Sequence, residues 1–254
     1  MARKLSIMDS GWLMMETRET PMHVGGLALF GVPEDAPSDY MESVYRYMVE
    51  VDGVCRPFSQ KIQSRLPGRL DAAWVDDKNF DIDYHVRHSA LPRPGRVREL
   101  LALVSRLHAQ RLDPSRPLWE SYLIEGLEGN RFALYTKMHH SMVDGMAGMH
   151  LMQSRMASSA DERLPAPWSG EWDSRKKPRK KNVAVAAKSG VLDGVGSVRR
   201  GAGQLVDLLR LPKESNVKTI YRAPKTQLNC RVTGARRFAA QSWSLPRIKA
   251  AAKQ

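Results

Sequence analysis

Two alternating segments in the middle of the chain constrain its fold more than any other feature. Trp119–Glu125 and Arg131–Met138 are rich in aromatic, branched and polar residues in alternation, and Gly126–Asn130 between them has the composition of a turn. Segments of this length, joined by a short glycine-containing turn, predict an antiparallel hairpin. The chain must therefore contain a sheet, and whatever follows Met138 leaves that sheet at the end of a strand.

Helix and strand signals on both sides of the hairpin indicate a mixed α/β domain. Val24–Val32 predicts a buried strand, whereas Asp39–Val51 and Arg96–Leu112 predict amphipathic helices because their apolar residues recur at helical spacing. Ser38 is the expected N-cap of the first helix. The remaining expected elements are strands at Ala73–Val75, Phe80–Val86 and Arg236–Leu245, a methionine-rich helix at Gly145–Met156, and the start of a helix at Arg247–Gln254.

Positive charge is concentrated in the last third of the chain. Residues 1–160 hold 19 Lys/Arg against 20 Asp/Glu, and residues 161–254 hold 21 against 7, which gives the net charge of +13. Arg175–Lys181 alone places six cations in seven residues, and Ala184–Leu211 after it reads as one or two glycine-interrupted amphipathic helices. A near-neutral body with a basic arm is expected, and the arm should attract anionic surfaces.

Composition excludes several classes of protein. The longest apolar runs, such as Leu100–Val104, are far below the roughly 18 residues of a membrane span. Asp9 interrupts any apolar segment near the N-terminus, so no secretory signal is expected. Cys55 and Cys230 form no CxxC pair, which argues against a disulfide scaffold or a cysteine-rich zinc site. A reducing cytoplasm is the expected compartment.

The segment from Met138 to Gly145 is the one that carries chemistry. Two adjacent histidines, His139 and His140, end the second hairpin strand, and Asp144 and Gly145 follow. By the period of two, His140 shares a face with Met138, whereas His139 points to the opposite face. A histidine that emerges from the apolar side at a strand end suits a general base for an alcohol.

Two other interpretations of this segment stay open on the residues alone. Any single histidine is more often a surface or core residue than a catalyst. His139, His140 and Asp144 are also metal-ligand types, but adjacent side chains on a strand diverge and no further histidine follows at a standard spacing. The metal interpretation is therefore the weaker one, and no metal is expected.

The motif and its surroundings resemble a known family. His139–Gly145 is similar to the HHxxxDG motif of the CoA-dependent acyltransferase superfamily. The wider chain resembles the bacterial wax ester synthase/diacylglycerol acyltransferase family, through Leu5–Ser10, Met22–Gly25 and Pro117–Glu120 as well as the motif. The resemblance covers essentially the whole chain.

The resemblance implies a fold and a set of roles. The fold would be α/β, a chloramphenicol-acetyltransferase-like mixed sheet with flanking helices, as one of two similar halves. His140 would be the general base, with His139 supporting the site or the acceptor and Asp144 orienting the loop. Gly145 would leave room for substrate. Trp119 and Glu120 would shape the strand beside the site, and simple packing and turn support explain them equally well.

The implied activity is transfer of a fatty acyl group from acyl-CoA to a long-chain alcohol or diacylglycerol. Acyl-CoA would be a substrate and no cofactor would be needed. The expected partners are the substrates and an anionic membrane or lipid-droplet surface, with no nucleic acid, and the expected location is the cytoplasm, peripherally on the inner membrane or lipid inclusions.

Members of this family are normally nearly twice this length. The expected organisation is therefore an acyltransferase domain at 1–160, a basic linker at 161–215, and at 216–254 the beginning of a C-terminal half that the chain lacks. The alternative is a noncatalytic lipid-surface binding protein derived from the enzyme.

Overall fold

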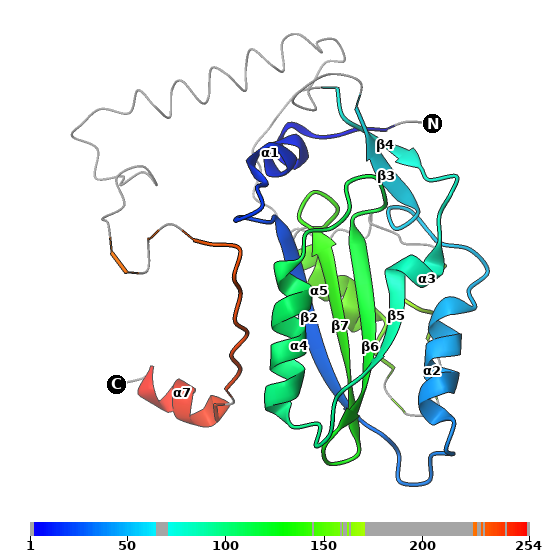
Figure 1. Ribbon diagram of the computed structural model, residues 1–254, viewed down its shortest axis with the longest axis vertical. Helices are drawn as coiled ribbons and strands as arrows, with labels where there is room; N and C mark the ends of the chain where they lie inside the picture. The colour runs from blue at the N-terminus through cyan, green and yellow to red at the C-terminus, as the bar shows by residue number, and fades with distance from the viewer. Residues whose placement is uncertain are drawn as a thin grey trace, which may run out of the picture. The chain divides into compact units, whose positions relative to one another are not determined.

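The computed structural model describes residues 3–64, 71–143, 145–157, 159, 162, 164–170, 226–227, 230, 232–241 and 243–252. These residues form a mixed α/β structure around a four-stranded sheet, with a second, three-stranded sheet at one end (Figure 1). The predicted fold class, a mixed sheet with flanking helices, is confirmed. Asp144, the basic segment Arg175–Lys181 and the helices expected over 184–211 lie outside the described residues. The boundaries expected at residues 160 and 215 stay predictions.

The main sheet is built on the predicted hairpin. It has the order β2 (His23–Gly31), β7 (Arg131–His139), β6 (Trp119–Leu127) and β5 (Val86–Ala90). β2 and β6 both run antiparallel to β7, and β5 runs parallel to β6. The turn between β6 and β7 needs left-handed backbone at Gly126, Gly129 and Asn130, residue types that adopt it readily.

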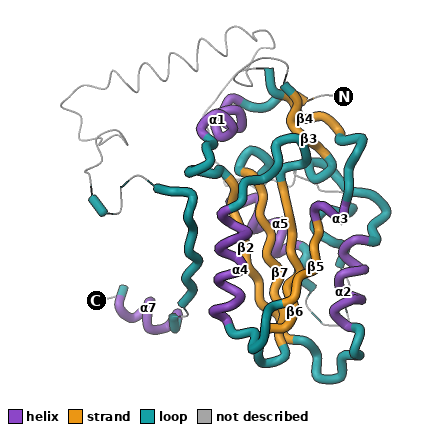
Figure 2. The backbone as a smooth tube through the Cα atoms, in the orientation of Figure 1, coloured by secondary structure: helices purple, strands orange, loops and turns teal. Residues whose placement is uncertain are grey.

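Helices cover both faces of this sheet (Figures 1 and 2). One face packs against α4 (Val97–Ala109), and the other packs against α2 (Tyr40–Val49) and α5 (Gly145–Ser154). We call these the α4 face and the α5 face. The α4-face core comprises Leu91, Leu100, Val104, Tyr122, Ile124, Leu127, Ala133 and Tyr135. The α5-face core includes Met48, Phe58, Val86, Trp119, Leu123, Phe132, Met138, Val143, Leu151 and Trp168.

The smaller sheet and the first helix lie beyond one end of the main sheet (Figure 1). The smaller sheet has the order β1 (Arg3–Lys4), β4 (Ala73–Asp76) and β3 (Gln60–Gln63). The helix α1 (Ile7–Met15) begins where the side chain of Ser6 accepts a hydrogen bond from the Asp9 backbone N–H at 3.1 Å. This N-cap fixes the helix that supplies two residues to the site described below.

β2 lies at the edge of the sheet and only its first residue is buried, so it is not the buried strand predicted at Val24–Val32. Three further local predictions need correction. α2 begins at Tyr40 with Asp39, not Ser38, as its N-cap residue, and no side chain caps it. The strand expected at Phe80–Val86 is instead a short helix, α3 (Ile82–His85), followed by β5. The carboxylate of Asp81 accepts the Asp83 backbone N–H at 3.1 Å and so favours the helical turn over an extended strand.

The third correction concerns the strand expected at Arg236–Leu245. The backbone of residues 236–241 is irregular, and the Phe238 backbone N–H donates to Ser105 Oγ of α4 at 2.7 Å instead of to a neighbouring strand. The helix expected near the end of the chain is present as α7 (Leu245–Ala251). Among the described residues, no helix has the length and apolar character needed to cross a membrane.

Candidate active site

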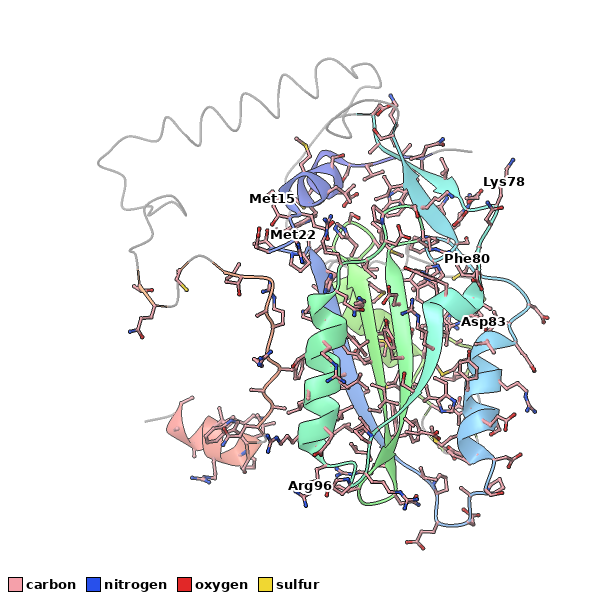
Figure 3. All side chains as sticks on the ribbon, in the orientation of Figure 1. Met15, Met22, Lys78, Phe80, Asp83 and Arg96 are labelled. Atoms are coloured by element: carbon pink, nitrogen blue, oxygen red, sulfur yellow. The ribbon has the colours of Figure 1, made fainter. Side chains whose placement is uncertain are left out.

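The end of β7 holds both histidines by their backbones. The His139 N–H donates to the Leu118 carbonyl at 2.9 Å, and the His140 N–H donates to the Met22 carbonyl at 2.8 Å. Met22 directly precedes β2 and lies just below α1 (Figure 3). The ladder between β2 and β7 thus continues one residue past the strand, and neighbouring elements on both sides fix the two histidines.

The residues of β7 that precede the histidine pair alternate between the two faces of the sheet. Tyr135 and Lys137, which precede His139 at intervals of two, contact α4: Lys137 Nζ donates to the carbonyls of Leu107 and Gln110 at 3.1 and 2.9 Å. Met138, on the other face, belongs to the α5-face core. The residues of this short segment therefore occupy two different environments.

His139 is buried in a hydrogen-bonded network. Its side chain is 1% exposed, and Nδ1 accepts the backbone N–H of Ser141 at 3.1 Å. Because an accepting Nδ1 carries no proton, the neutral ring carries its proton on Nε2. That nitrogen lies 3.9 Å from Oε1 of Glu16, the residue that ends α1. The network therefore fixes both the orientation and the tautomer of His139.

Glu16 is itself held in place. Its carboxylate accepts a hydrogen bond from Arg111 Nη2 at 2.7 Å and another from the Met22 backbone N–H at 3.3 Å. Burial alone would raise the pKa of Glu16, but the hydrogen bond from Arg111 and the charge of Arg111 outweigh burial and lower that pKa. Glu16 is therefore a carboxylate that faces the buried histidine.

His140 has different surroundings. It is half-buried, and its ring stacks on Trp12 of α1 with 4.4 Å between the ring centroids and 15° between the planes. Within the described part of the chain, no hydrogen bond to the His140 ring is present. The stack orients the ring and leaves its two nitrogens without a partner among the described residues.

The other predicted site residues lie in different places. Gly145 is the first residue of α5, directly after the loop that follows His140, and Asp144 lies outside the described residues. Trp119 is fully buried among aromatic rings, and its Nε1 donates to the Phe58 carbonyl at 2.8 Å. Its burial favours packing over direct contact with a substrate.

Glu120 lies on the α4 face and is 4% exposed. Its Oε2 is 3.2 Å from Nζ of Lys137, which has no exposed surface. Burial lowers the pKa of Lys137, and the charge of Glu120 opposes that shift. Lys137 also bonds the last carbonyls of α4, where a cation is favourable. Glu120 therefore supports the helix that covers the face of His139.

Two residues of the site were missed by the sequence analysis, Trp12 and Glu16. Trp12 lies in α1, and Glu16 is the C-cap residue of that helix. The sequence analysis predicted no helix there. The available signal was Ser6 followed three residues later by Asp9, an N-terminal capping pattern. Within the described ranges, no three His, Cys, Asp or Glu side chains come close enough to hold a metal ion.

The mixed sheet with a histidine pair at a strand end is the arrangement that the resemblance to CoA-dependent acyltransferases implied. The model of the wax ester synthase/diacylglycerol acyltransferase catalytic domain matches residues 5–254. The chain therefore belongs to the wax ester synthase/diacylglycerol acyltransferase family.

Individual relatives agree with this assignment. A probable diacylglycerol O-acyltransferase of Mycobacterium tuberculosis is 42% identical over 248 residues, which are 95% of this chain and 53% of that protein. The O-acyltransferase WSD of Acinetobacter baylyi is 36% identical over 259 residues, 99% of this chain and 55% of that protein. The solved wax ester synthase/diacylglycerol acyltransferase of Marinobacter aquaeolei VT8 matches with a TM-score of 0.74 and 37% identity, over 98% of this chain and 55% of that one. The chain thus spans about half the length of these relatives.

Proposed function

We propose that this chain is the general-base half of an acyl-CoA-dependent O-acyltransferase. The reaction transfers a fatty acyl group from acyl-CoA to a long-chain alcohol or to diacylglycerol, and forms a wax ester or triacylglycerol. Membership in the family supports the reaction class. The placement of His140 is the observation that carries the assignment of the base.

That placement meets the requirements of a general base. The backbone of His140 is bonded to Met22, and its ring is oriented by Trp12. A ring held by stacking keeps its nitrogen lone pair free for the hydroxyl of the acceptor. A base must come within roughly 2.6–3.2 Å of the oxygen that it deprotonates.

The chemistry needs no covalent enzyme intermediate. The neutral imidazole of His140 takes the hydroxyl proton as the alcohol oxygen attacks the thioester carbonyl carbon. The C–O bond forms, the tetrahedral oxyanion collapses, and the C–S bond breaks. The departing CoA thiolate then takes the proton from the imidazolium, so His140 returns to its starting state. Acyl-CoA is a substrate, and no cofactor takes part.

His139 has a positioning role in this proposal. Its ring is held between Ser141 and Glu16 on the α4 face. A fixed His139 anchors the backbone turn on which His140 stands. Asp144 would orient the same loop, and Gly145 would leave space beside it.

The basic arm is proposed to hold the enzyme at its lipid substrates. The excess of positive charge beyond residue 160 supports this role. Residues 161–200 should bind anionic vesicles and release them as salt rises, because the Debye length shortens from about 10 Å at 0.1 M to about 3 Å at 1 M. Co-sedimentation at several salt concentrations measures this. Equal binding to neutral vesicles would contradict it.

Thiol release from palmitoyl-CoA in the presence of hexadecanol tests the proposed reaction. The 254-residue chain is compared with a chimera in which the rest of the Acinetobacter baylyi relative follows residue 254. The chimera should release thiol and form the ester, whereas the chain alone should do little, because holding both substrates and excluding water supplies much of the rate. Equal rates for the chain and the chimera would indicate that all the residues needed for catalysis lie within residues 1–254. A folded chimera without ester formation would contradict the proposed reaction.

A further inference from the structure

The carboxylate of Glu16 joins the end of α1 to three other elements beside the histidine pair. Its Oε2 accepts a hydrogen bond at 2.7 Å from Nη2 of Arg111, which follows α4 by two residues. Its Oε1 accepts the Met22 backbone N–H at 3.3 Å and lies 3.9 Å from Nε2 of His139. The same carboxylate therefore faces the end of α4, the residue before β2 and the last residue of β7.

Met22 extends this connection to the proposed base. Its N–H donates to Glu16, and its carbonyl accepts the His140 backbone N–H at 2.8 Å. In Figure 3, Met22 lies next to Met15, the last residue of α1. Since only Met22 separates the carboxylate from the His140 backbone, a displacement of Glu16 would also move the hydrogen bond that holds His140.

α1 also contacts the ring of the base. Trp12 stacks on the His140 ring with 4.4 Å between the ring centroids. Glu16 follows Trp12 by four residues, which is about one helical turn. A single helix therefore meets His140 through Trp12 and His139 through Glu16, and the position of that helix decides the surroundings of both histidines.

Apolar packing alone holds α1 weakly. Among the described side chains of α1, only Leu13 is buried. More than half of the side chain is exposed at each of Met8, Met14 and Met15. The helix has nine residues, and helices of this length are marginal in water without tertiary contacts. The polar contacts at the end of α1 are therefore needed to fix its position.

Arg111 is the group that keeps this carboxylate charged. The Glu16 side chain is 6% exposed and the Arg111 side chain 38%. Burial raises the pKa of Glu16, and the hydrogen bond from Arg111 lowers it. The other described titratable groups that face Glu16 are His139 on β7 and His23 on β2. Both can be neutral, whereas the guanidinium group of Arg111 is always charged.

We propose that Arg111 is a positioning residue for the histidine pair: it holds Glu16, and through Glu16 it fixes α1, Met22 and both histidines. Arg111 does not touch the reacting atoms in this account. The expected effect on rate rests on the proposed function, whereas the effect on the histidines can be measured without turnover.

Steady-state kinetics of the chimera test the effect on rate. Arg111→Met should lower kcat by roughly 10- to 100-fold with KM nearly unchanged, because a misplacement of about 1 Å costs up to that factor. Arg111→Lys keeps the positive charge but not the planar fork, so it should restore part of kcat. The matched control is Arg46→Met, which breaks a 2.8 Å ion pair with Glu42 on α2 and should behave as the wild type.

The pH profile shows whether Arg111 acts through Glu16. Without Arg111, burial raises the pKa of Glu16, so the carboxylate takes up a proton as the pH falls. Arg111→Met should therefore lose progressively more activity than the wild type toward acidic pH. Glu16→Gln is neutral at every pH, so its loss relative to the wild type should not vary with pH.

The double variant Glu16→Gln/Arg111→Met tests whether the two side chains act as one unit. It should match Glu16→Gln alone, because Arg111 has no other route to the histidines in this account. It also leaves no unpaired buried carboxylate, so it carries the test if Arg111→Met does not fold. Thermal unfolding reports the folding of each variant.

Chemical modification tests the same contacts without turnover. Diethyl pyrocarbonate modifies accessible histidine side chains, and peptide mass spectrometry follows each histidine of the 254-residue chain. His139 is 1% exposed and should react slowly in the wild type and in Arg46→Met. It should react roughly 10- to 100-fold faster in Arg111→Met, because losing a charge-assisted hydrogen bond raises the population of the open form by about that factor.

Four results would each overturn the proposal: wild-type kcat in a folded Arg111→Met variant, a change confined to KM, additive losses in the double variant, or unchanged protection of His139. A change confined to KM would indicate that Arg111 binds substrate. Faster modification of His139, together with a chimera that forms no ester, would keep the role of Arg111 at the histidine pair and reject the proposed reaction.

Discussion

Two adjacent histidines of this chain, one at the end of β7 and one directly after it, have different surroundings. His139 is buried on the α4 face, bonded to Ser141 and 3.9 Å from the carboxylate of Glu16. His140 is half-buried and is held by a ring stack with Trp12. The difference begins at the strand end, because His139 is the last residue of β7 and His140 lies in the turn that follows.

The comparison extends from the two residues to the two faces. The α4 face carries a connected set of polar groups under its helix, including Glu120, Lys137, His23 and His108. The α5 face next to His140 carries small and apolar residues and an open pocket. A network of buried hydrogen bonds and ion pairs fixes geometry, whereas an apolar pocket can accept a ligand. The α4 face thus holds bonded polar groups, and the α5 face offers an apolar pocket.

The largest expected loss of stability comes from separating Glu120 and Lys137. Glu120→Gln should lower the free energy of unfolding by about 3–5 kcal/mol, because it leaves a buried ammonium group without its counter-charge. Chemical denaturation measures this. The double variant Glu120→Gln/Lys137→Met removes both charges and should recover part of the loss. A single variant within about 0.5 kcal/mol of the wild type would remove the structural role assigned to this pair.

The second effect is a pH dependence of the free energy of unfolding, and it arises from a histidine on the α4 face. Burial lowers the pKa of His23 to about 4, although its bond to the His108 carbonyl opposes the shift. The unfolded chain, with a pKa near 6.5, therefore binds more protons between pH 4 and 6.5. The contribution of His23 is fully present above pH 6.5, and about 3 kcal/mol is lost as the pH falls to 4.

His23→Gln should remove this part of the slope while keeping a donor for the His108 carbonyl. Denaturant unfolding at several pH values across the window compares the variant with the wild type. Burial also lowers the pKa values of His85 and His108, so a smaller slope should remain in the variant. An unchanged slope would show that His23 is not the group that titrates.

The smallest effect concerns the stack that holds His140. Trp12→Leu should reduce the turnover number of the chimera by roughly two- to tenfold, since an aromatic pair contributes about 0.5–1.5 kcal/mol beyond its burial. Trp12→Phe should retain most of the activity because it keeps a ring. Steady-state kinetics separate kcat from KM. A change in KM with kcat intact would indicate that Trp12 contacts substrate and does not orient the base.

The sequence predicts the parts of this site that depend on local periodicity. The hairpin of β6 and β7, and the opposite faces of Lys137 and Met138, follow from the alternation between Trp119 and Met138. The site residues from α1 do not follow in the same way, because Glu16 and Trp12 meet the histidines through contacts more than a hundred residues apart in the chain. Periodicity predicts the face to which a side chain points, but it does not predict which distant element packs against that face.

Local hydrogen bonds can also favour a structure that differs from the one that the sequence pattern predicts. Phe80–Val86 has the composition of a strand, but Asp81 caps a helical turn inside it. Residues 236–241 are not strand because Phe238 bonds the side chain of Ser105. The roles of Asp144 and Gly145, and the membrane association of the basic arm, stay predictions.

The central claim is that His140, and not its neighbour, is the general base. The most direct test is kcat/KM for thiol release by the chimera with His140→Ala, with and without added imidazole, and with the exposed His150→Ala as a matched control. His140→Ala should lose roughly 10²- to 10⁴-fold while its melting temperature stays unchanged, free imidazole should restore part of the rate, and His150→Ala should behave as the wild type. A folded His140→Ala variant that turns over near the wild-type rate would contradict the account.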